Sequence, residues 1–268
     1  MRTSPPSLDW PWNWTMAVLQ SDTEPATSPG GVSALPVSRP RFSRPLRFPW
    51  PLPPRGSRVG RRLVHLYVGL VLYGASDALL VRAGLGLDPW DVLHQGVTRR
   101  TGLSIGTVSI ITGALVLLLW WPMRQRPGLG TVSNVLLIGL SLDATLRLVP
   151  VLHSMAARVP LLAAAIVLNA IATGLYISAR FGPGPRDGLM TGLHRRTGRS
   201  IRLVRTAIEV VVLATGFLLG GSVGVGTVAY ALAIGPLAQV FLKVFALPRP
   251  GERAVAAPAA GASAPATV

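Results

Sequence analysis

The stretch Gly86–Val108, GLDPWDVLHQGVTRRTGLSIGTV, occurs twice in this chain of 268 residues. The second copy, Gly182–Val204, begins 96 residues later and reads GPGPRDGLMTGLHRRTGRSIRLV. Without a gap the copies are identical at 12 of 23 positions. At the same offset, Gly128–Gly139 (GLGTVSNVLLIG) matches Gly224–Gly235 (GVGTVAYALAIG) at 7 of 12 positions. The chain therefore contains an internal duplication, and its fold is to be interpreted as two related halves.

The composition is that of a membrane protein. Half of the residues are hydrophobic, 13% are charged and the mean hydropathy is +0.48. The apolar residues form long runs, which are typical of membrane spans. The net charge of +16 comes from arginines in the loops between these runs, so it indicates orientation rather than nucleic-acid binding. There is no cysteine, which excludes disulfides and thiolate metal sites.

The apolar runs predict an all-α polytopic fold with six spans, each near the roughly 20 residues that cross a bilayer. The predicted spans are Leu63–Val81, Leu103–Trp121, Thr131–Val149, Pro160–Ala179, Leu203–Gly220 and Thr227–Leu247. The first membrane repeat then covers residues 58–152 and the second covers 153–247.

The two ends of the chain are predicted to be disordered tails. Residues 1–57 are rich in proline and lack an apolar run of spanning length, and residues 248–268 are rich in alanine and proline. The first tail lies outside the duplication, so a start codon placed too far upstream is an alternative interpretation.

The arginines and the lysine near the span ends predict the orientation. Fifteen lie on one side and five on the other, which places both termini in the cytoplasm. Because each half has an odd number of spans, the second half is expected to be inverted relative to the first. A full span at Pro89–Arg100 would instead make the repeat parallel, but this segment is too short and too polar to cross.

The duplicated stretch predicts a short amphipathic or re-entrant helix after the first span of each half. In the first copy Asp88 is placed to cap the helix, Pro89 to begin it and Gly102 to end it. Ser104 is placed to cap the following span. Helix capping thus explains many of the residues that are identical in the two copies in purely structural terms. The glycines and threonines of the GxGT motifs favour tight turns over a phosphate site, because the P-loop lysine is absent.

A functional interpretation of the same helices depends on one polar face. Residues spaced by four share a side of a helix, which groups Asp91, Gln95 and Arg99 in the first copy. The same spacing groups Asp187, Thr191 and Arg195 in the second copy. If both helices re-enter the membrane from opposite sides, the two faces meet in one central solute site; if they lie at the interface, the faces only contact solvent.

Charged residues within spans are costly in lipid, so Asp77 and Glu209 complete the candidate solute-binding residues. Structural ion pairs with Arg82 and Arg205 are the alternative for these two carboxylates. Asp143 is expected to pair with Arg147. No triad, metal-binding histidine motif or paired-carboxylate loop is present, so we expect no enzyme activity, no catalytic residue, no metal and no cofactor.

Three motifs carry a resemblance to a known family. DPWDVLHQGVTRRTGLSIG at 88–106, PGLGTVSNVLLIG at 127–139 and GPRDGLMTGLHRRTG at 184–198 resemble the YczE-type membrane proteins, relatives of the YitT family. The resemblance covers roughly residues 60–247. It implies a polytopic protein of the bacterial plasma membrane, but it does not indicate a substrate. Two features depart from it: the long first tail, and the replacement of DPW by GPR in the second copy.

Two functions follow as hypotheses. The inverted duplication with paired polar helices favours a secondary transporter or permease for a small solute, with a polar site between the repeats. The alternative is a non-transporting sensor or scaffold that binds a partner protein or anionic lipid through its arginine-rich loop, Arg186–Arg205. The expected partners are the lipid bilayer and a small-molecule solute, without nucleic acid.

Overall fold

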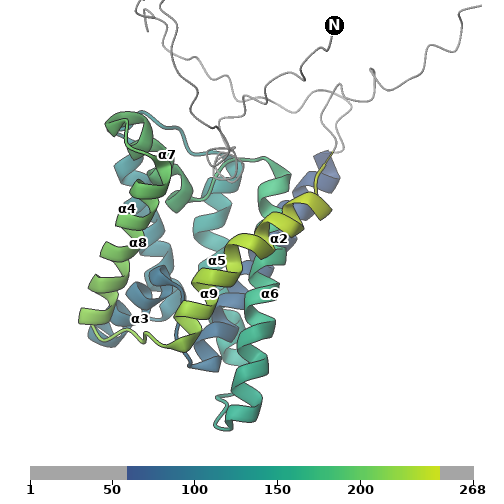
Figure 1. Ribbon diagram of the computed structural model, residues 1–268. Helices are drawn as coiled ribbons and strands as arrows, with labels where there is room; N and C mark the ends of the chain where they lie inside the picture. Colours follow the sequence, from purple (N-terminus) through teal and green to yellow (C-terminus); the bar gives the residue numbers. More distant parts are fainter. Residues whose placement is uncertain (1–58, 248–268) are drawn as a thin grey trace, which may run out of the picture. The chain divides into compact units, whose positions relative to one another are not determined.

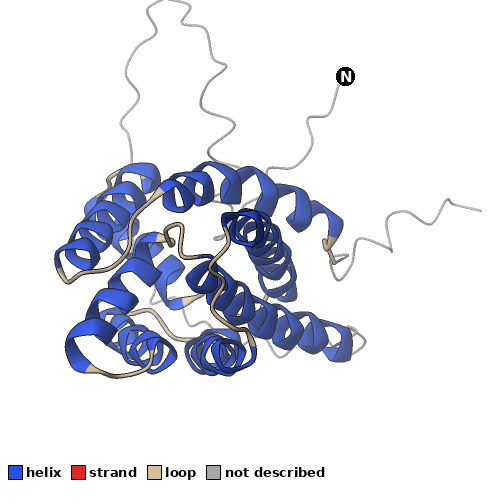
Figure 2. Cartoon of the chain, turned by 90° about the horizontal axis from the view of Figure 1, so that it is seen from below, coloured by secondary structure: helices blue, strands red, loops and turns tan. Residues whose placement is uncertain are grey.

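The computed structural model describes residues 59–247, which form eight helices joined by loops, with no strand among them (Figures 1 and 2). The all-α class is therefore confirmed. The helices are α2 Val59–Ala83, α3 Pro89–Thr101, α4 Ile105–Trp120, α5 Leu129–Leu148, α6 Met155–Ala179, α7 Pro185–Thr197, α8 Ile201–Leu218 and α9 Val225–Val244. The predicted tails, 1–57 and 248–268, lie outside the described residues.

Four helices, α2, α5, α6 and α9, have both the length and the apolar composition of a membrane span. A fifth span results if α3 and α4 are counted as one broken span, since they meet at a bend of 114°. The other two predicted spans differ for physical reasons: α4 has only 16 residues, and α8 carries Arg202, Arg205 and Glu209. The arrangement of six spans therefore stays a prediction.

The ends of the short helices follow the sequence. Asp88 Oδ1 accepts hydrogen bonds from the backbone N–H groups of Trp90 (2.8 Å) and Asp91 (3.1 Å), as expected of an N-cap. Gly102 ends α3 with a φ of 75°, and Gly198 ends α7 with a φ of 66°. Ser104 caps α4 by accepting from Thr107 N. These predicted caps are confirmed.

The two halves pack on each other through α2 and α6, which run antiparallel. One buried cluster joins the C-terminal part of α2 (Leu80, Ala83) to the N-terminal part of α6 (Leu162, Ile166). A second cluster joins the N-terminal part of α2 (Leu66, Leu70) to the C-terminal part of α6 (Tyr176, Ala179). Each of these residues lies 96 positions from one in the other cluster, so the duplication is also a repetition of this part of the core.

Two equivalent arginines fix this antiparallel pair at its ends. Arg62 Nε donates to Ala179 O at the C-terminus of α6 (3.0 Å), and Arg158 Nε donates to Ala83 O at the C-terminus of α2 (2.7 Å). Each arginine thus satisfies carbonyl groups that a helix leaves without an internal partner, at the end where a positive charge is favourable.

The GxGT motifs serve close backbone packing between the halves. Gly226 N donates to Leu85 O (2.8 Å), and in the equivalent contact Gly130 N donates to Phe181 O (2.9 Å). The loop before α3 therefore lies against the start of α9, and the loop before α7 against the start of α5. The turn interpretation of these motifs agrees with their geometry.

The short helices pack on the opposite half and lie at opposite ends of the helical bundle (Figure 1). Helix α3 packs against the C-terminal part of α8, where Gly96 and Gly216 allow the backbones to approach. Helix α7 packs against the C-terminal part of α4, and Trp120 Nε1 donates to Pro185 O (3.2 Å). Both short helices are thus held inside the protein, with one side buried.

Candidate functional site

A polar network crosses from α2 to α6 and α9 in the middle of the apolar core. The Asn169 side-chain amide donates to Ser76 Oγ (2.8 Å) and to Asp77 Oδ1 (2.9 Å). Its carbonyl oxygen accepts from Tyr230 Oη (3.0 Å). All four side chains are at least nine-tenths buried. Asp77, predicted as a site residue, is therefore held by an amide and not by Arg82, which donates to Leu146 O.

The loop before α3 brings two more carboxylates to the same place. Asp88 precedes α3 and Asp91 lies in its first turn, where His94 Nδ1 donates to Asp91 Oδ1 (3.1 Å). One oxygen atom each of Asp77, Asp88 and Asp91 lies within 4.8 Å of the others, and the three residues are 0%, 1% and 1% exposed. Three buried carboxylates thus share one small volume at the contact of α2 and α3.

Each carboxylate is held by one oxygen and leaves the other without a partner. The Oδ1 atoms accept from Asn169, from two backbone N–H groups and from His94, respectively. The Oδ2 atoms of all three are buried and have no hydrogen-bond partner among the described residues. An unpaired buried charge is costly, so this arrangement requires compensation by a proton or by a positively charged group.

One positive charge reaches the cluster from the second half. Arg186, at the start of α7, lies with Nη1 3.7 Å from Asp88 Oδ1 and with its guanidinium over the ring of Trp90, 5.4 Å from the centroid. Its side chain is 26% exposed. Burial and the neighbouring Asp91 carboxylate raise the pKa of Asp88 to about 7, although Arg186 and the backbone hydrogen bonds oppose the rise.

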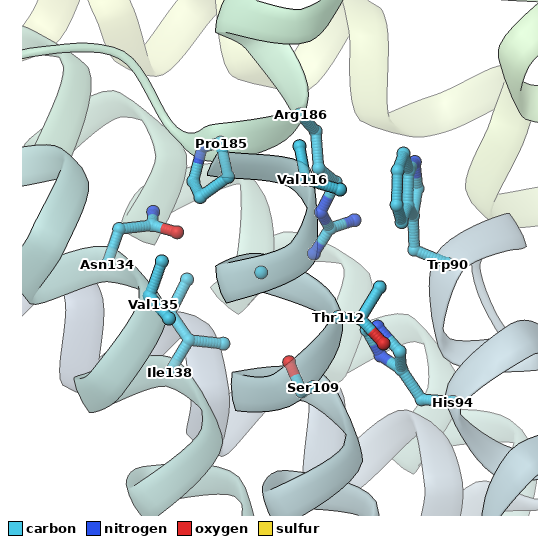
Figure 3. Close-up of a pocket in the computed structure, with 11 residues that line it drawn as sticks. Trp90, His94, Ser109, Thr112, Val116, Asn134, Val135, Ile138, Pro185 and Arg186 are labelled. Carbon is cyan, nitrogen blue, oxygen red and sulfur yellow. The ribbon is translucent and has the colours of Figure 1, made fainter. Parts of the chain in front are cut away.

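A small pocket adjoins this cluster between α3, α4, α5 and α7 (Figure 3). Its volume is about 30 Å³, room for one or two water molecules. Trp90, His94 and Arg186 line it from the side of the cluster, and the polar groups of Ser109, Thr112 and Asn134 line it from α4 and α5. A small cavity with polar walls therefore lies next to the charged cluster.

Of the predicted site residues, Asp77 and Asp91 meet, whereas Gln95 and Arg99 have other contacts. Gln95 Oε1 accepts from Ser222 N (2.6 Å). Arg99 is exposed and donates to Gly220 O and to Ser222 Oγ. Both side chains therefore fix α3 to the loop after α8, which is a structural task.

The candidates in the second half also have other contacts. Asp187 accepts from Tyr176 Oη (3.0 Å), and buried Thr191 donates to Gly188 O within its own helix. Arg195 is exposed. Glu209 forms the expected i,i+4 ion pair with Arg205 (2.8 Å) on a partly exposed face of α8. Asp143 has a structural role but with a different partner: it accepts from Ser104 Oγ and Gly106 N at the start of α4, and the expected pair with Arg147 is replaced by this cap.

Arg186 and Asp88 were not predicted as site residues. Asp88 was interpreted as an N-cap, which uses only one of its oxygens. Arg186 was counted as an orientation charge. The signal that could have identified both is the departure between the copies: DPW in the first becomes GPR in the second, so that Trp90 and Arg186 occupy equivalent positions and contact each other.

Several apolar helices that expose apolar side chains around a buried charged cluster define the class: this is a membrane protein. A family model described as "Family of unknown function (DUF6198)" matches residues 60–243, and the chain belongs to this family.

Three curated relatives are similar over most of their length. An uncharacterized protein of Haemophilus influenzae is 40% identical over 68% of this chain and 83% of its own. The uncharacterized membrane protein YczE of Bacillus subtilis is 31% identical over 65% of this chain and 82% of its own. The uncharacterized protein YyaS of the same organism is 24% identical over 68% and 93%. The expected resemblance to YczE-type proteins is confirmed. No solved structure matches the chain.

Proposed function

We propose that the protein is a secondary transporter or permease for a small solute, with its polar site between the two halves. One observation carries the proposal: the buried charged cluster combines Asp77, Asp88 and Asp91 of the first half with Asn169 and Arg186 of the second. Transporters built from inverted repeats place their sites where the repeats meet, next to the ends of short or broken helices. A movement of one half against the other would change the contacts of every group in this cluster.

The proposal includes six spans in two inverted repeats of the bacterial plasma membrane. In its favour, α4 and α8 expose apolar side chains such as Leu118 (68%), Val211 (64%) and Leu218 (77%), which lipid would cover. At 1.5 Å per residue, α4 and α8 are about 24 and 27 Å long, close to the hydrocarbon thickness of about 30 Å. The charged residues of α8 lie in its first half, where long side chains can extend to the interface.

The topology has a direct test because the chain has no cysteine to remove. Thr101 and Thr197 are equivalent exposed residues at the ends of α3 and α7, and each donates to a carbonyl of its own helix. In inverted repeats a membrane-impermeant maleimide labels Thr101→Cys from outside the cell and Thr197→Cys only after the membrane is opened. Labelling of both variants from the same side would contradict the inversion.

Transport itself is tested with purified full-length protein in proteoliposomes. The liposomes are loaded with labelled amino acids, organic acids, sugars or inorganic ions in separate assays, and efflux is followed. We expect flux of one class that Asp77→Asn abolishes and that Glu209→Gln, at a carboxylate outside the cluster that pairs with Arg205, leaves unchanged. Folded protein that carries none of these classes would contradict the proposal.

A sensor or scaffold is the second candidate, and the exposed arginines at the end of α7 favour it. Arg195, Arg196 and Arg199 are exposed, and each basic residue near an anionic membrane surface contributes about 1 kcal/mol. This function would need the surface of α7 and not the buried cluster. Arginine-to-glutamine variants at these positions would then lose binding to anionic lipid, while Asp77→Asn would keep it.

A further inference from the structure

We propose that Asp77, Asp88 and Asp91 together bind a divalent metal cation of the class that prefers oxygen ligands, such as Ca²⁺, Mg²⁺ or Mn²⁺. The inference rests on the proposed function, because it names a ligand for the site between the two halves. It also stands on geometry that is independent of transport.

The positions of the carboxylates are those of a ligand set. One oxygen of each residue lies within 4.8 Å of the other two, and two ligands at up to 2.6 Å from one cation can lie up to about 5.2 Å apart. The ligands come from two elements: Asp77 lies in α2, and Asp88 and Asp91 lie at the start of α3. Oxygen ligands alone favour Mg²⁺, Ca²⁺ or Mn²⁺ over zinc and copper, which prefer nitrogen and sulfur.

A second observation points to a ligand. The Oδ2 atoms of all three residues are buried and lack a partner, although the Oδ1 atoms are well bonded. The surrounding groups thus orient each carboxylate and leave one oxygen of each available. Asn169 does this for Asp77, the start of α3 for Asp88 and His94 for Asp91. Outer contacts that fix the ligands in this way are typical of metal sites.

The charges also leave room for a cation. When a cation displaces their protons, the three carboxylates carry three negative charges, and Arg186 supplies one positive charge at 3.7 Å from Asp88. Two negative charges then remain in a nearly closed apolar core, and a divalent cation balances them. A pocket that is lined by Trp90, His94 and Arg186 lies beside the cluster.

The test uses full-length protein in detergent, stripped of metal with a chelator, and Mn²⁺ as the probe. Bound Mn²⁺ loses the sharp paramagnetic resonance spectrum of the free ion, which gives stoichiometry and affinity directly; Ca²⁺ and Mg²⁺ then serve as competitors. We expect one saturable site per chain. The variants Asp77→Asn, Asp88→Asn and Asp91→Asn, which conserve volume, are expected to weaken Mn²⁺ binding about 10- to 100-fold or more. Glu209→Gln is the matched control and is expected to bind as the native chain does.

A variant that strengthens binding guards against loss of fold as an explanation. Arg186→Met removes the competing positive charge and keeps an unbranched side chain, so the affinity for Mn²⁺ is expected to rise. Absence of saturable binding to folded native protein would overturn the proposal, and would indicate that protons neutralise the carboxylates. Binding that survives all three asparagine variants would overturn it as well.

The cation site and the transport function can be disproved independently of each other. Mn²⁺ binding at the cluster, without flux of any solute class, would support the cation site and contradict the transporter. Solute flux that is unchanged by chelation of divalent cations, together with no Mn²⁺ binding, would support the transporter and contradict the cation site.

Discussion

The two loops that precede the short helices have similar backbone conformations but carry different side chains. Gly86 and Gly182 have φ values of 119° and 123°, and both loops accept an N–H from a GxGT motif of the other half. The first loop continues with Asp88 and Trp90, whereas the second has Gly184 and Arg186 at the same positions. Both copies thus have the same contacts between the halves, whereas the Asp88 carboxylate is found only in the first copy and the Arg186 guanidinium that faces it only in the second.

The shared backbone is where a substitution should have the largest effect. A Cβ atom at Gly86 would lie 2.7 Å from Gly224 N and from Thr227 Oγ1, and the positive φ adds strain. We expect Gly86→Val to destabilise the protein by about 2 to 6 kcal/mol, which is enough to prevent recovery of folded protein. Gly182→Val should be similarly severe, as the halves are equivalent here. The measurement is the yield of monodisperse protein in detergent.

The control for these variants is Gly60→Ala, because nothing lies within 4 Å of a Cβ atom at this exposed position. Normal yield of Gly86→Val would show that the loop contacts are not what holds the halves together. A severe effect of only one of the two valine variants would break the equivalence of the loops.

The second largest loss of stability is expected for Arg186→Met, in the loop whose side chains differ between the copies. This variant leaves the buried Asp88 without its positive neighbour, and we expect a loss of about 1 to 3 kcal/mol in metal-free protein, less than for a fully buried pair because Arg186 is 26% exposed. The measurement is unfolding in mixed detergent micelles, followed by tryptophan fluorescence.

A double variant sharpens this prediction. Asp88→Asn in combination with Arg186→Met removes both charges, so part of the lost stability should return. The control is Arg195→Met, which replaces an exposed arginine of the same helix and is expected to have little effect. Strictly additive effects of Asp88→Asn and Arg186→Met would show that the two side chains do not interact.

The remaining prediction is a dependence of stability on pH. The pKa of Asp88 rises from 3.8 to about 7 on folding, so the folded state holds this proton more tightly than the unfolded state. The resulting stability is fully present below about pH 4 and is lost as the pH rises through about 7. Metal-free protein should therefore melt at a higher temperature near pH 5 than near pH 8, and Asp88→Asn should reduce this difference. An unchanged difference in Asp88→Asn would contradict the assignment to Asp88.

The duplication and the local signals were sufficient to predict the helices and those helix ends that carry a cap, whereas α6 begins at Met155, five residues before the predicted start at Pro160. Asp88, Gly102 and Ser104 cap as expected because capping depends on residues close in sequence. The repeat also predicted which segments are equivalent, and the equivalent contacts of Arg62 and Arg158 agree with it.

The site could be predicted only in part, because packing over long distances decides it. Asp77 and Asp91 were both candidates, but nothing local indicates that α2 brings Asp77 against the start of α3. Gln95 and Arg99 share the predicted helix face, yet α3 lies against the end of α8 and both side chains bond there. Sequence also cannot distinguish an arginine that contacts lipid headgroups from one that turns inward, which is why Arg186 was missed.

The central claim is that the charged cluster belongs to a site that opens to water and is not a sealed core. The most direct measurement is the reaction of Thr112→Cys, in the pocket beside His94 and Arg186, with a charged, membrane-impermeant thiol reagent in intact cells and in opened membranes. The controls are Leu118→Cys on the exposed apolar face of the same helix, expected to be unreactive, and Thr101→Cys at the end of α3, expected to react. We expect Thr112→Cys to react with the reagent, and we expect Mn²⁺ to change the rate of this reaction. No reaction of Thr112→Cys in either preparation, with folded protein and reactive Thr101→Cys, would contradict it.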